Sequence, residues 1–590
     1  MLCSLDHRRW LAVFLAAGLT GCSFIVDDSP YACTGGAPCA SDMRAPVCES
    51  SSDCGGTTPH CFEGACYACM PQRLCEDDAS LCVRDTAGPR ASCQPLLDPD
   101  RECNFTYPRD LDSLRNEDIF AFGVIADLGG NGNEPSAEDP TAAYGVPWAL
   151  AVQTAIAMIH DSAVGGLPVQ PATRKLLAIF CDETTPDPSG NDRDTVLKAR
   201  VDHLAETLGV PAIIGGSKST ATGLINARYL EGRETLLLSP SATADGLPEV
   251  RRNAFSEQLL WRTVTPDARQ AQALKSAQEL AAVAARKNTT KLDVVSVYDD
   301  DNTASSGLQD RMSAFYNFAD SPTYAENDDA SQAMAVARIL RAKPAFIMPF
   351  GTEEFVAKML AKVEEDWDES LSYRPWYIMS EGNRTNYMSA LARMDLVDRV
   401  IGTAPGARSA EFYRAFRSDY KRVFNTTREP ANLAECGYDA VYMLSYAAIR
   451  ASREGAWPRG RQLAAAISTL SCKDEGAKPL RASRADFAAH ARVLARATDE
   501  GCFDFDGASG PVDYAPVDDS SDATQELSAA SSDIALWCLG RPNDKDQTVN
   551  MKHYFKQPEG ATPGMILALP DSMAGALSLD KPGWCAADAN

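Results

Sequence analysis

The chain of 590 residues has few histidines, fewer basic than acidic residues, and no long apolar run beyond its first 22 residues. Its 56 Lys and Arg against 81 Asp and Glu give a net charge of -25. That charge argues against nucleic acid as a partner, because phosphate binding needs a basic surface. It also argues against electrostatic docking on an anionic membrane leaflet. Without a later run of about 18 apolar residues, we expect no membrane-spanning helix in the rest of the chain.

Catalytic motifs are missing as well. None of the 6 histidines forms a convincing pair with a nucleophile, and neither H-E-x-x-H nor G-x-S-x-G occurs. The stretch GGSKST at 215–220 superficially resembles a phosphate-binding loop, but that loop needs Gly directly before Lys218, where Ser217 stands. We therefore expect no enzyme, no metal and no cofactor.

The N-terminus carries a targeting signal over residues 1–22. His7-Arg8-Arg9 supplies a positive start, and an apolar core too short to span a bilayer follows. Leu19-Thr20-Gly21-Cys22 resembles a bacterial lipobox, in which cleavage precedes a cysteine that receives lipid. The alternative is an ordinary signal peptide with a stray cysteine. Lipidated Cys22 implies anchoring in the cell envelope. Ser23, not Asp, follows it, and by resemblance to enterobacterial lipoprotein sorting this favours the outer membrane over the inner one.

A cysteine-rich stretch follows, with eleven cysteines between Cys33 and Cys103. Disulfides are the usual way to stabilise such a segment in an exported chain, although Cys66-x-x-Cys69 also has the spacing of zinc ligands. We interpret 23–118 as a disulfide-rich spacer. Because eleven is an odd number, at least one cysteine pairs outside the segment or stays reduced. Cys472–Cys502 is a further expected pair, which would tie a helical segment to the core.

From Ile119 onward, apolar strand-like runs alternate with helix-like stretches, which predicts a parallel sheet with helices on both faces. The most informative stretch is 213–248. A buried strand ends there in Gly-Gly-Ser-Lys-Ser-Thr, a helix follows, and the next strand ends in Ser-Pro-Ser-Ala-Thr. Two neighbouring strand ends rich in small hydroxyl residues predict a polar crevice at the carboxyl edge of the sheet, where open α/β sheets bind ligands.

The pair GGSKST…LLLSPSATADGL resembles the type I periplasmic binding proteins, most closely the leucine/isoleucine/valine-binding branch. The resemblance implies two doubly wound, Rossmann-like α/β lobes joined by a three-segment hinge. It implies lobe 1 over 119–262 and 406–500, lobe 2 over 263–405 and 501–542, and it leaves 543–590, rich in Pro, Gly and Asp, as a loosely ordered tail.

The same resemblance implies which residues touch a ligand. In lobe 1, the Ser217 hydroxyl and the Ser219 and Thr220 amides suit a carboxylate, whereas Ser241 and Thr243 suit an ammonium group. In lobe 2, Glu381 in Met-Ser-Glu-Gly-Asn matches an acidic residue that faces the ammonium. Further candidates that would line the cleft are Tyr144, Thr303 and Phe350.

Each candidate has a simpler alternative. Ser and Thr at strand ends also cap helices, Glu381 also fits a solvated loop, and the run Asp299 to Asp301 fits a solvated turn better than a cation site. Asn302-Thr303-Ala304 replaces the large aromatic residue of the family, and Lys218 replaces a small hydroxyl residue. Lys218 favours an extra acidic group on the ligand.

These observations favour a lipoprotein that captures a small solute, an amino acid or related compound, and presents it to an ABC permease or a sensor. Closure of two lobes around a hinge would bury the ligand. The alternative is an envelope scaffold of the same shape without a ligand.

Overall fold

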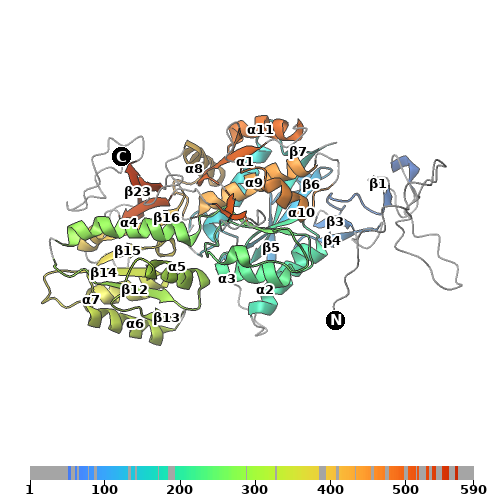
Figure 1. The fold of residues 1–590 in the computed structure, drawn as a ribbon. Coiled ribbons are helices and arrows are strands. Elements are labelled where there is room, and N and C mark those ends of the chain that lie inside the picture. The colour runs from blue at the N-terminus through green and yellow to red at the C-terminus, as the bar shows by residue number, and fades with distance from the viewer. Residues whose placement is uncertain are drawn as a thin grey trace, which may run out of the picture.

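Two β-sheets organise the computed structural model of the protein (Figure 1). The structure describes residues 51–568 apart from short internal stretches, the longest of which are 184–192, 385–393 and 517–525. Lobe 1 denotes the seven-stranded sheet with its helices, and lobe 2 the eight-stranded sheet with its helices. The predicted targeting signal, Met1 to Cys22, lies outside the described residues.

Lobe 1 contains a parallel sheet in the strand order β11-β10-β9-β6-β8, with β5 added antiparallel at its edge. The central strand β6 shows why the sheet is covered on both faces. Its residues alternate, so that Phe122 and Val124 enter one apolar core while Ala121 and Ile125 enter the other. The strands are β5 (Cys103–Tyr107), β6 (Asp118–Ala126), β7 (Leu167–Val169), β8 (Ala172–Asp182), β9 (Ala212–Gly215), β10 (Leu236–Ser239) and β11 (Leu260–Arg262).

Helices cover both faces of this sheet. On one face, α1 and α9 pack against each other, and most of their side chains are buried. On the other face lie α2 and α3, each of which continues into a wider turn of π-helix. The helices are α1 (Val146–His160), α2 (Arg193–Asp202), α3 (Ser219–Leu224), α8 (Glu411–Phe424), α9 (Ala434–Ala451), α10 (Gly460–Ile467) and α11 (Arg484–Arg496).

Lobe 2 repeats this arrangement with parallel strands in the order β13-β12-β14-β15-β16. The strands are β12 (Val294–Asp299), β13 (Thr323–Tyr324), β14 (Phe346–Phe350), β15 (Trp376–Met379) and β16 (Val400–Pro405). Its helices are α4 (Asp267–Ala285), α5 (Thr303–Ser313), α6 (Asp329–Ala342) and α7 (Ala361–Glu365). Helices α4 and α5 share one apolar core and α6 and α7 the other, so this sheet is also covered on both faces.

The chain crosses between the lobes three times, which agrees with the fold implied by the resemblance. It enters lobe 2 between β11 and α4, returns between β16 and α8, and enters lobe 2 again before β22 (Ile534–Leu539). Strand β22 pairs antiparallel with β16, and Gly402 makes this possible because a Cβ there would lie 2.0 Å from Cε2 of Trp537.

Two parts of the expected division differ from the structure. Strands β18 (Phe503–Gly507) and β19 (Gly510–Pro511) belong with lobe 1, because Phe503 and Phe505 are buried in its core. The expected loose tail after residue 542 instead contains β23 (Thr548–Lys556) and β24 (Met565–Ala568), which extend the lobe 2 sheet beyond β22. Free backbone groups at a sheet edge recruit such strands, whatever the composition of the segment.

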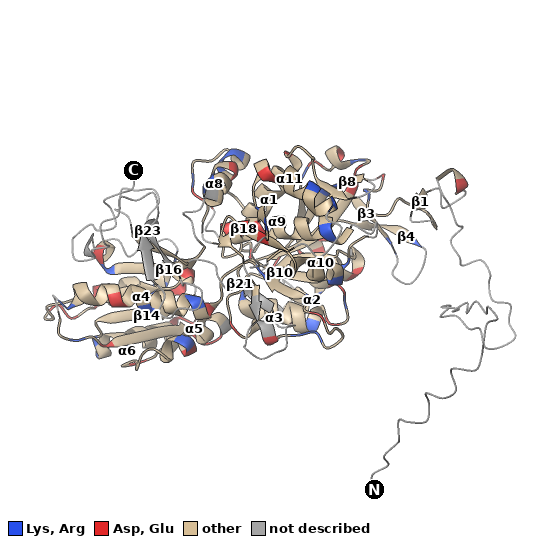
Figure 2. Cartoon of the chain, turned by 45° about the horizontal axis from the view of Figure 1, so that its top comes forward, with Lys and Arg blue, Asp and Glu red and all other residues tan. Residues whose placement is uncertain are grey.

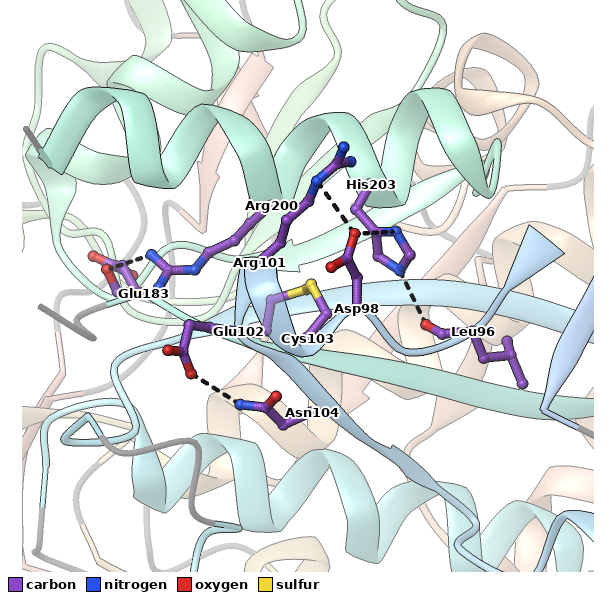
Figure 3. Close-up of a disulfide and its surroundings, with 10 residues drawn as sticks. Leu96, Asp98, Arg101, Glu102, Cys103, Asn104, Glu183, Arg200 and His203 are labelled. Atoms are coloured by element: carbon purple, nitrogen blue, oxygen red, sulfur yellow. Dashed lines mark hydrogen bonds and ion pairs between the residues drawn. A yellow bond between two sulfur atoms is a disulfide. The ribbon is translucent and has the colours of Figure 1, made fainter. Parts of the chain in front are cut away.

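The spacer is stapled by disulfides, as expected. Its described part contains Cys54–Cys66, Cys69–Cys82 and Cys75–Cys93, together with the hairpins β1–β2 (His60–Phe62, Ala65–Tyr67) and β3–β4 (Ser80–Arg84, Ala91–Pro95). Of the two expected outcomes for the odd cysteine, pairing outside the segment is found, in Cys103–Cys181 (Figure 3). Cys502 is disulfide-bonded, whereas Cys472 lies outside the described residues.

The end of the spacer is part of lobe 1 rather than a separate module, since β5 pairs with β8 and Leu81 and Leu96 are buried in the lobe 1 core. His203, which follows α2, lies 3.0 Å from the carbonyl oxygen of Leu96 and 3.8 Å from Asp98 (Figure 3). The expected boundary at residue 118 therefore falls too late in the chain.

Charged residues of both signs are interspersed on the helices of both lobes (Figure 2). Among the described residues, none of the helices combines the length and the apolar character needed to cross a bilayer.

Candidate functional site

A cavity lies between the carboxyl edges of the two sheets. The space between atoms there is about 430 Å³, a figure that includes open solvent at the mouth of the cavity. Lobe 1 contributes the residues that follow β9 and β10, and lobe 2 contributes those that follow β12, β14 and β15. The lining residues are Tyr144, Ser217, Lys218, Ser219, Ser241, Thr243, Asp267, Asn302, Ala304, Ser305, Leu308, Gly351, Ser380, Glu381 and Gly382.

The turn after β9 brings Ser217 to the cavity and holds it there. Gly215 has φ +149°, and a Cβ on it would lie 2.3 Å from the carbonyl oxygen of Ile125, so only glycine fits. The Ser217 amide donates to Glu183 Oε2 at 2.6 Å, and its Oγ accepts from the Asp127 amide at 2.7 Å. With its amide and one lone pair engaged, Ser217 can still donate its hydroxyl hydrogen to an acceptor in the cavity.

The turn after β10 is tied to the turn after β9. Ser241 Oγ lies 3.1 Å from the carbonyl oxygen of Gly216 and 3.0 Å from that of Ser217, and donates to one of them at a time. Ser219 Oγ accepts from the Ala244 amide at 3.1 Å. The carbonyl oxygen of Thr243 accepts from the Asp267 amide at 3.0 Å, which links this turn to the start of α4. The lobe 1 wall is therefore a rigid set of small hydroxyl groups.

Glu381 supplies a carboxylate from the lobe 2 side. It begins the turn after β15, is 7% exposed, and accepts a hydrogen bond from Gln270 Nε2 of α4. Burial raises the pKa of Glu381, while the Gln270 hydrogen bond acts in the opposite direction. Gln270 Nε2 also lies 3.3 Å from Thr403 Oγ1, so α4 and β16 together fix the position of this carboxylate.

Six of the nine expected ligand residues meet at this cavity: Ser217, Ser219, Ser241, Thr243, Glu381 and Tyr144. Tyr144 lies close enough to Glu381 that burial and this neighbouring charge raise its pKa well above the usual value.

The other three expected residues do not line the cavity. Thr220 is exposed, because one residue into α3 the helix turns it away from the cavity. Phe350 is fully buried in the lobe 2 core, and only its carbonyl oxygen approaches the site, where it accepts from Ser305 Oγ. The Thr303 side chain lies outside the described part of the structure, although its neighbours Asn302 and Ala304 line the cavity.

Asp267 is the main site residue that sequence reasoning missed. It is the first residue of α4, is 1% exposed, and lines the cavity beside Glu381. Burial, then the neighbouring Glu381 and Asp245, raise its pKa well above the usual value. The sequence feature that could have pointed to Asp267 is its place as an acidic residue at the start of the long helix that follows the first crossing between lobes.

Within the described part of the chain, two clusters of acidic or sulfur side chains lie close enough together to be considered as metal sites. Asp299, Asp300 and Asp301 bring carboxylate oxygens within 4.8 Å of one another, but Asp299 Oδ1 accepts from the Asp301 amide, as in an ordinary Asx turn. The other cluster, Cys69, Cys75 and Cys93, consists of disulfide-bonded cysteines.

Comparison with known proteins places this geometry in a family. The family described as "Receptor family ligand binding region" matches residues 187–514, which is more than half of the chain, and the protein belongs to this family. Among curated protein sequences, none is similar enough to this chain to count as a relative.

Solved structures of substrate-binding proteins share the fold. The branched-chain amino acid transporter substrate-binding protein LivJ of Streptococcus pneumoniae, in complex with isoleucine, has 16% identity and a TM-score of 0.50, covering 73% of this chain and 99% of its own. The fatty acid ABC transporter substrate-binding protein of Thermomonospora curvata has 14% identity and a TM-score of 0.50, covering 74% and 92%. A solute-binding protein of an ABC transporter from Rhodopseudomonas palustris HaA2, in complex with p-hydroxybenzoic acid, has 13% identity and a TM-score of 0.50, covering 75% and 98%. At these identities the likeness establishes the fold alone.

Proposed function

We propose that the protein captures a small solute, an amino acid or a related compound, in the cavity between its lobes and presents it to an ABC permease or a sensor. The observation that carries this proposal is the meeting of two opposed polar sets at one cavity. Hydroxyl groups of Ser217 and Ser219 come from lobe 1, and the Glu381 carboxylate comes from lobe 2.

This arrangement complements the two charged ends of an amino acid. Hydroxyl donors of lobe 1 suit a carboxylate, and the carboxylate of Glu381 suits an ammonium group. Because Glu381 and Ser217 are both buried, their hydrogen bonds to a ligand would form with little competition from water. A ligand that bridges both lobes stabilises the closed form, which a transporter or a sensor can then recognise.

Thermal melting across a panel of amino acids and aromatic acids tests the proposal. A ligand at 100 times its Kd stabilises the folded protein by about 2.7 kcal/mol. We expect at least one amino acid to raise the melting temperature of the wild type, and Glu381→Gln to abolish that rise. Glu369→Gln, which changes an 85% exposed carboxylate of lobe 2, is the matched control and should behave like the wild type.

If no compound shifts the melting temperature, or if Glu381→Gln retains the full shift, the binding proposal is wrong. If no compound shifts the melting temperature, the alternative hypothesis remains, namely an envelope scaffold of the same fold without a ligand. We propose no catalytic role, since the family is one of ligand-binding regions.

We also propose that Cys22 is lipidated after removal of residues 1–21, so that the spacer and the two lobes are held at the envelope, with the outer membrane as the expected location. Four disulfides with both cysteines described support an oxidising compartment outside the cytoplasm. Mass spectrometry of the mature N-terminus would show acylated Cys22; an unmodified N-terminus beyond it would contradict the anchor.

A further inference from the structure

The cavity wall has more hydrogen-bond acceptors than donors around Asp267. Both carboxylate oxygens of Asp267 are buried, and among the described residues neither accepts a hydrogen bond of normal geometry. Oε1 of Gln270, three residues further along the first turn of α4, is also buried and accepts no hydrogen bond from the described residues. The Thr243 hydroxyl is close enough to Asp267 to favour its charged form, but it does not satisfy the carboxylate. A buried carboxylate without partners is costly, so this one calls for a donor that the protein does not supply.

Asp267 does not serve as the cap of its own helix. The amides of Arg269 and Gln270 in the first turn of α4 go to the carbonyl oxygen of Pro266, at 3.1 and 3.3 Å. A negative charge at a helix start gains from the helix dipole, but that gain of about 0.5–1 kcal/mol does not offset the burial of an unpaired carboxylate. Helix structure alone therefore does not account for the residue.

Nearby cations have other partners. The Arg262 guanidinium donates to the carbonyl oxygens of Ala242 and Ala244 at 3.1 and 2.9 Å, and Arg311 pairs with Asp245 at 2.7 Å. Lys218 lies near Glu353, whose pKa burial and Glu354 raise to about 7 while Lys218 opposes that rise. Asp267 and Glu381 thus leave the cavity with a local excess of carboxylate.

We infer that Asp267 is a second ligand-binding carboxylate, so that the cavity takes a diamino acid, with one ammonium group at Glu381 and the other at Asp267. This inference rests on the proposed function and names the ligand class of the same site. An ammonium group carries three donors and no acceptor, which is the complement of an acceptor-rich wall. Aromatic or aliphatic acids without nitrogen would bring no cationic donor to Asp267.

Calorimetric titration with a matched pair of ligands tests the inference. L-2,4-diaminobutyrate and L-2-aminobutyrate differ only in the second ammonium group, and L-lysine and L-leucine extend the comparison to longer chains. We expect the wild type to bind a diamino acid at least about tenfold more tightly than its monoamino partner, since a charge-assisted hydrogen bond is at stake. Asp267→Asn should lose that preference, whereas Asp267→Glu, which keeps the charge, should retain part of it.

Proton release gives a second measure that a purely structural role would not change. Burial raises the pKa of Asp267 in the free protein, and an ammonium group bound beside it would lower that pKa, so binding would be coupled to proton release. Titration of diaminobutyrate in buffers of different ionisation enthalpy should show proton release in the wild type and a smaller release in Asp267→Asn. The other charged groups facing Asp267 are Glu381, Asp245 and Arg262, and the variant leaves all three in place.

Two failures are distinguishable. If the wild type binds monoamino acids as tightly as diamino acids, or if Asp267→Asn keeps the preference, the inference is overturned and the proposed function stands. If no amino acid binds the wild type at all, the proposed function fails and the inference fails with it. Should Asp267→Asn not fold, the ligand preference of the wild type and of Asp267→Glu still decides the question.

Discussion

At the scale of single residues, two buried acidic side chains hold the loops around the cavity in position. Asp182 accepts from the amides of Leu128 and Gly130 at 3.1 and 3.0 Å, and Glu183 accepts from the amide of Ser217. Asp182 is the last residue of β8, and Glu183 follows it directly. Hydrogen bonds to charged acceptors are worth more than neutral ones, about 1.5–3 kcal/mol each, so these two residues hold the strand-end loops that carry the site.

His160 makes the stability of lobe 1 sensitive to acid. It is the last residue of α1, and its Nε2 accepts from the Leu176 amide of β8 at 2.9 Å, which only the neutral ring can do. Burial, then the charge of Lys175, lower the pKa of His160 to about 4, against about 6.5 in the unfolded chain. The unfolded state therefore binds the proton first, and stability present above pH 6.5 is lost as pH falls toward 4.

We expect this loss to reach about 1–3 kcal/mol, and His160→Gln to lose less than the wild type over the same range. Denaturant unfolding at pH 7 and at pH 4.5 measures it, and taking the difference between variants cancels the titration of other groups. His60→Gln in the spacer serves as the control. Equal acid losses in His160→Gln and the wild type would contradict the assignment.

Strand-end residues were the predictable part of the site. Ser217, Ser241 and Thr243 follow neighbouring strands of one parallel sheet, whose carboxyl ends share one edge. Glu381 follows a strand of the other sheet, and the resemblance to the binding-protein family predicted its place opposite them. Asp267 could not be found in this way, because it begins a helix after a crossing, and only the packing of the lobes brings that helix start to the cavity.

Elements were predictable where their patterns are strong. The apolar runs of β6, β9, β10, β12 and β14 gave their strands, and the order of elements gave two parallel sheets. Strands β23 and β24 were missed because their segment is rich in Pro, Gly and Asp, and the edge of an existing sheet decided its structure instead. The π-helical turns after α2 and α3 have no signature in the apolar pattern.

At the scale of secondary-structure elements, the disulfide between β5 and β8 joins the spacer to lobe 1. Cys103 and Cys181 are fully buried, lie opposite each other in the sheet, and close a loop of 78 residues (Figure 3). Replacing both with Ala should destabilise lobe 1 by about 2–4 kcal/mol, since a long loop gains conformational freedom when unfolded. Thermal unfolding followed by circular dichroism measures the loss.

Cys54–Cys66 provides the matched control for this prediction. It closes a loop of 12 residues in the outer part of the spacer, away from the lobe 1 core. Its replacement with Ala should leave the main unfolding transition in place. Equal effects of the two double replacements on the main unfolding transition would contradict a specific role of Cys103–Cys181 in stabilising lobe 1.

At the scale of the whole molecule, the two lobes also touch outside the cavity. Arg311 of α5 in lobe 2 pairs with Asp245, which follows β10 in lobe 1, at 2.7 Å. The Arg311 side chain is 55% exposed, so the pair is worth about 0–1 kcal/mol. Because it joins the lobes only where they are close together, it favours the closed form.

Arg311→Gln should therefore shift the population toward an open form and weaken ligand affinity by up to about fivefold. Small-angle scattering at low salt, without and with saturating ligand, would report a larger radius of gyration for the variant only in the absence of ligand. Lys275→Gln, which breaks a pair with Glu279 within α4, should leave the radius unchanged. Identical behaviour of both variants would exclude a role for the interlobe pair in closure.

A crystal structure of the protein with the amino acid that stabilises it most would test the central claim most directly. The account predicts ligand density between the two sheets, with a carboxylate at the Ser217 and Ser219 hydroxyls and an ammonium group within hydrogen-bond distance of Glu381. Density bound elsewhere on the molecule, or a ligand whose nitrogen points away from Glu381, would contradict it.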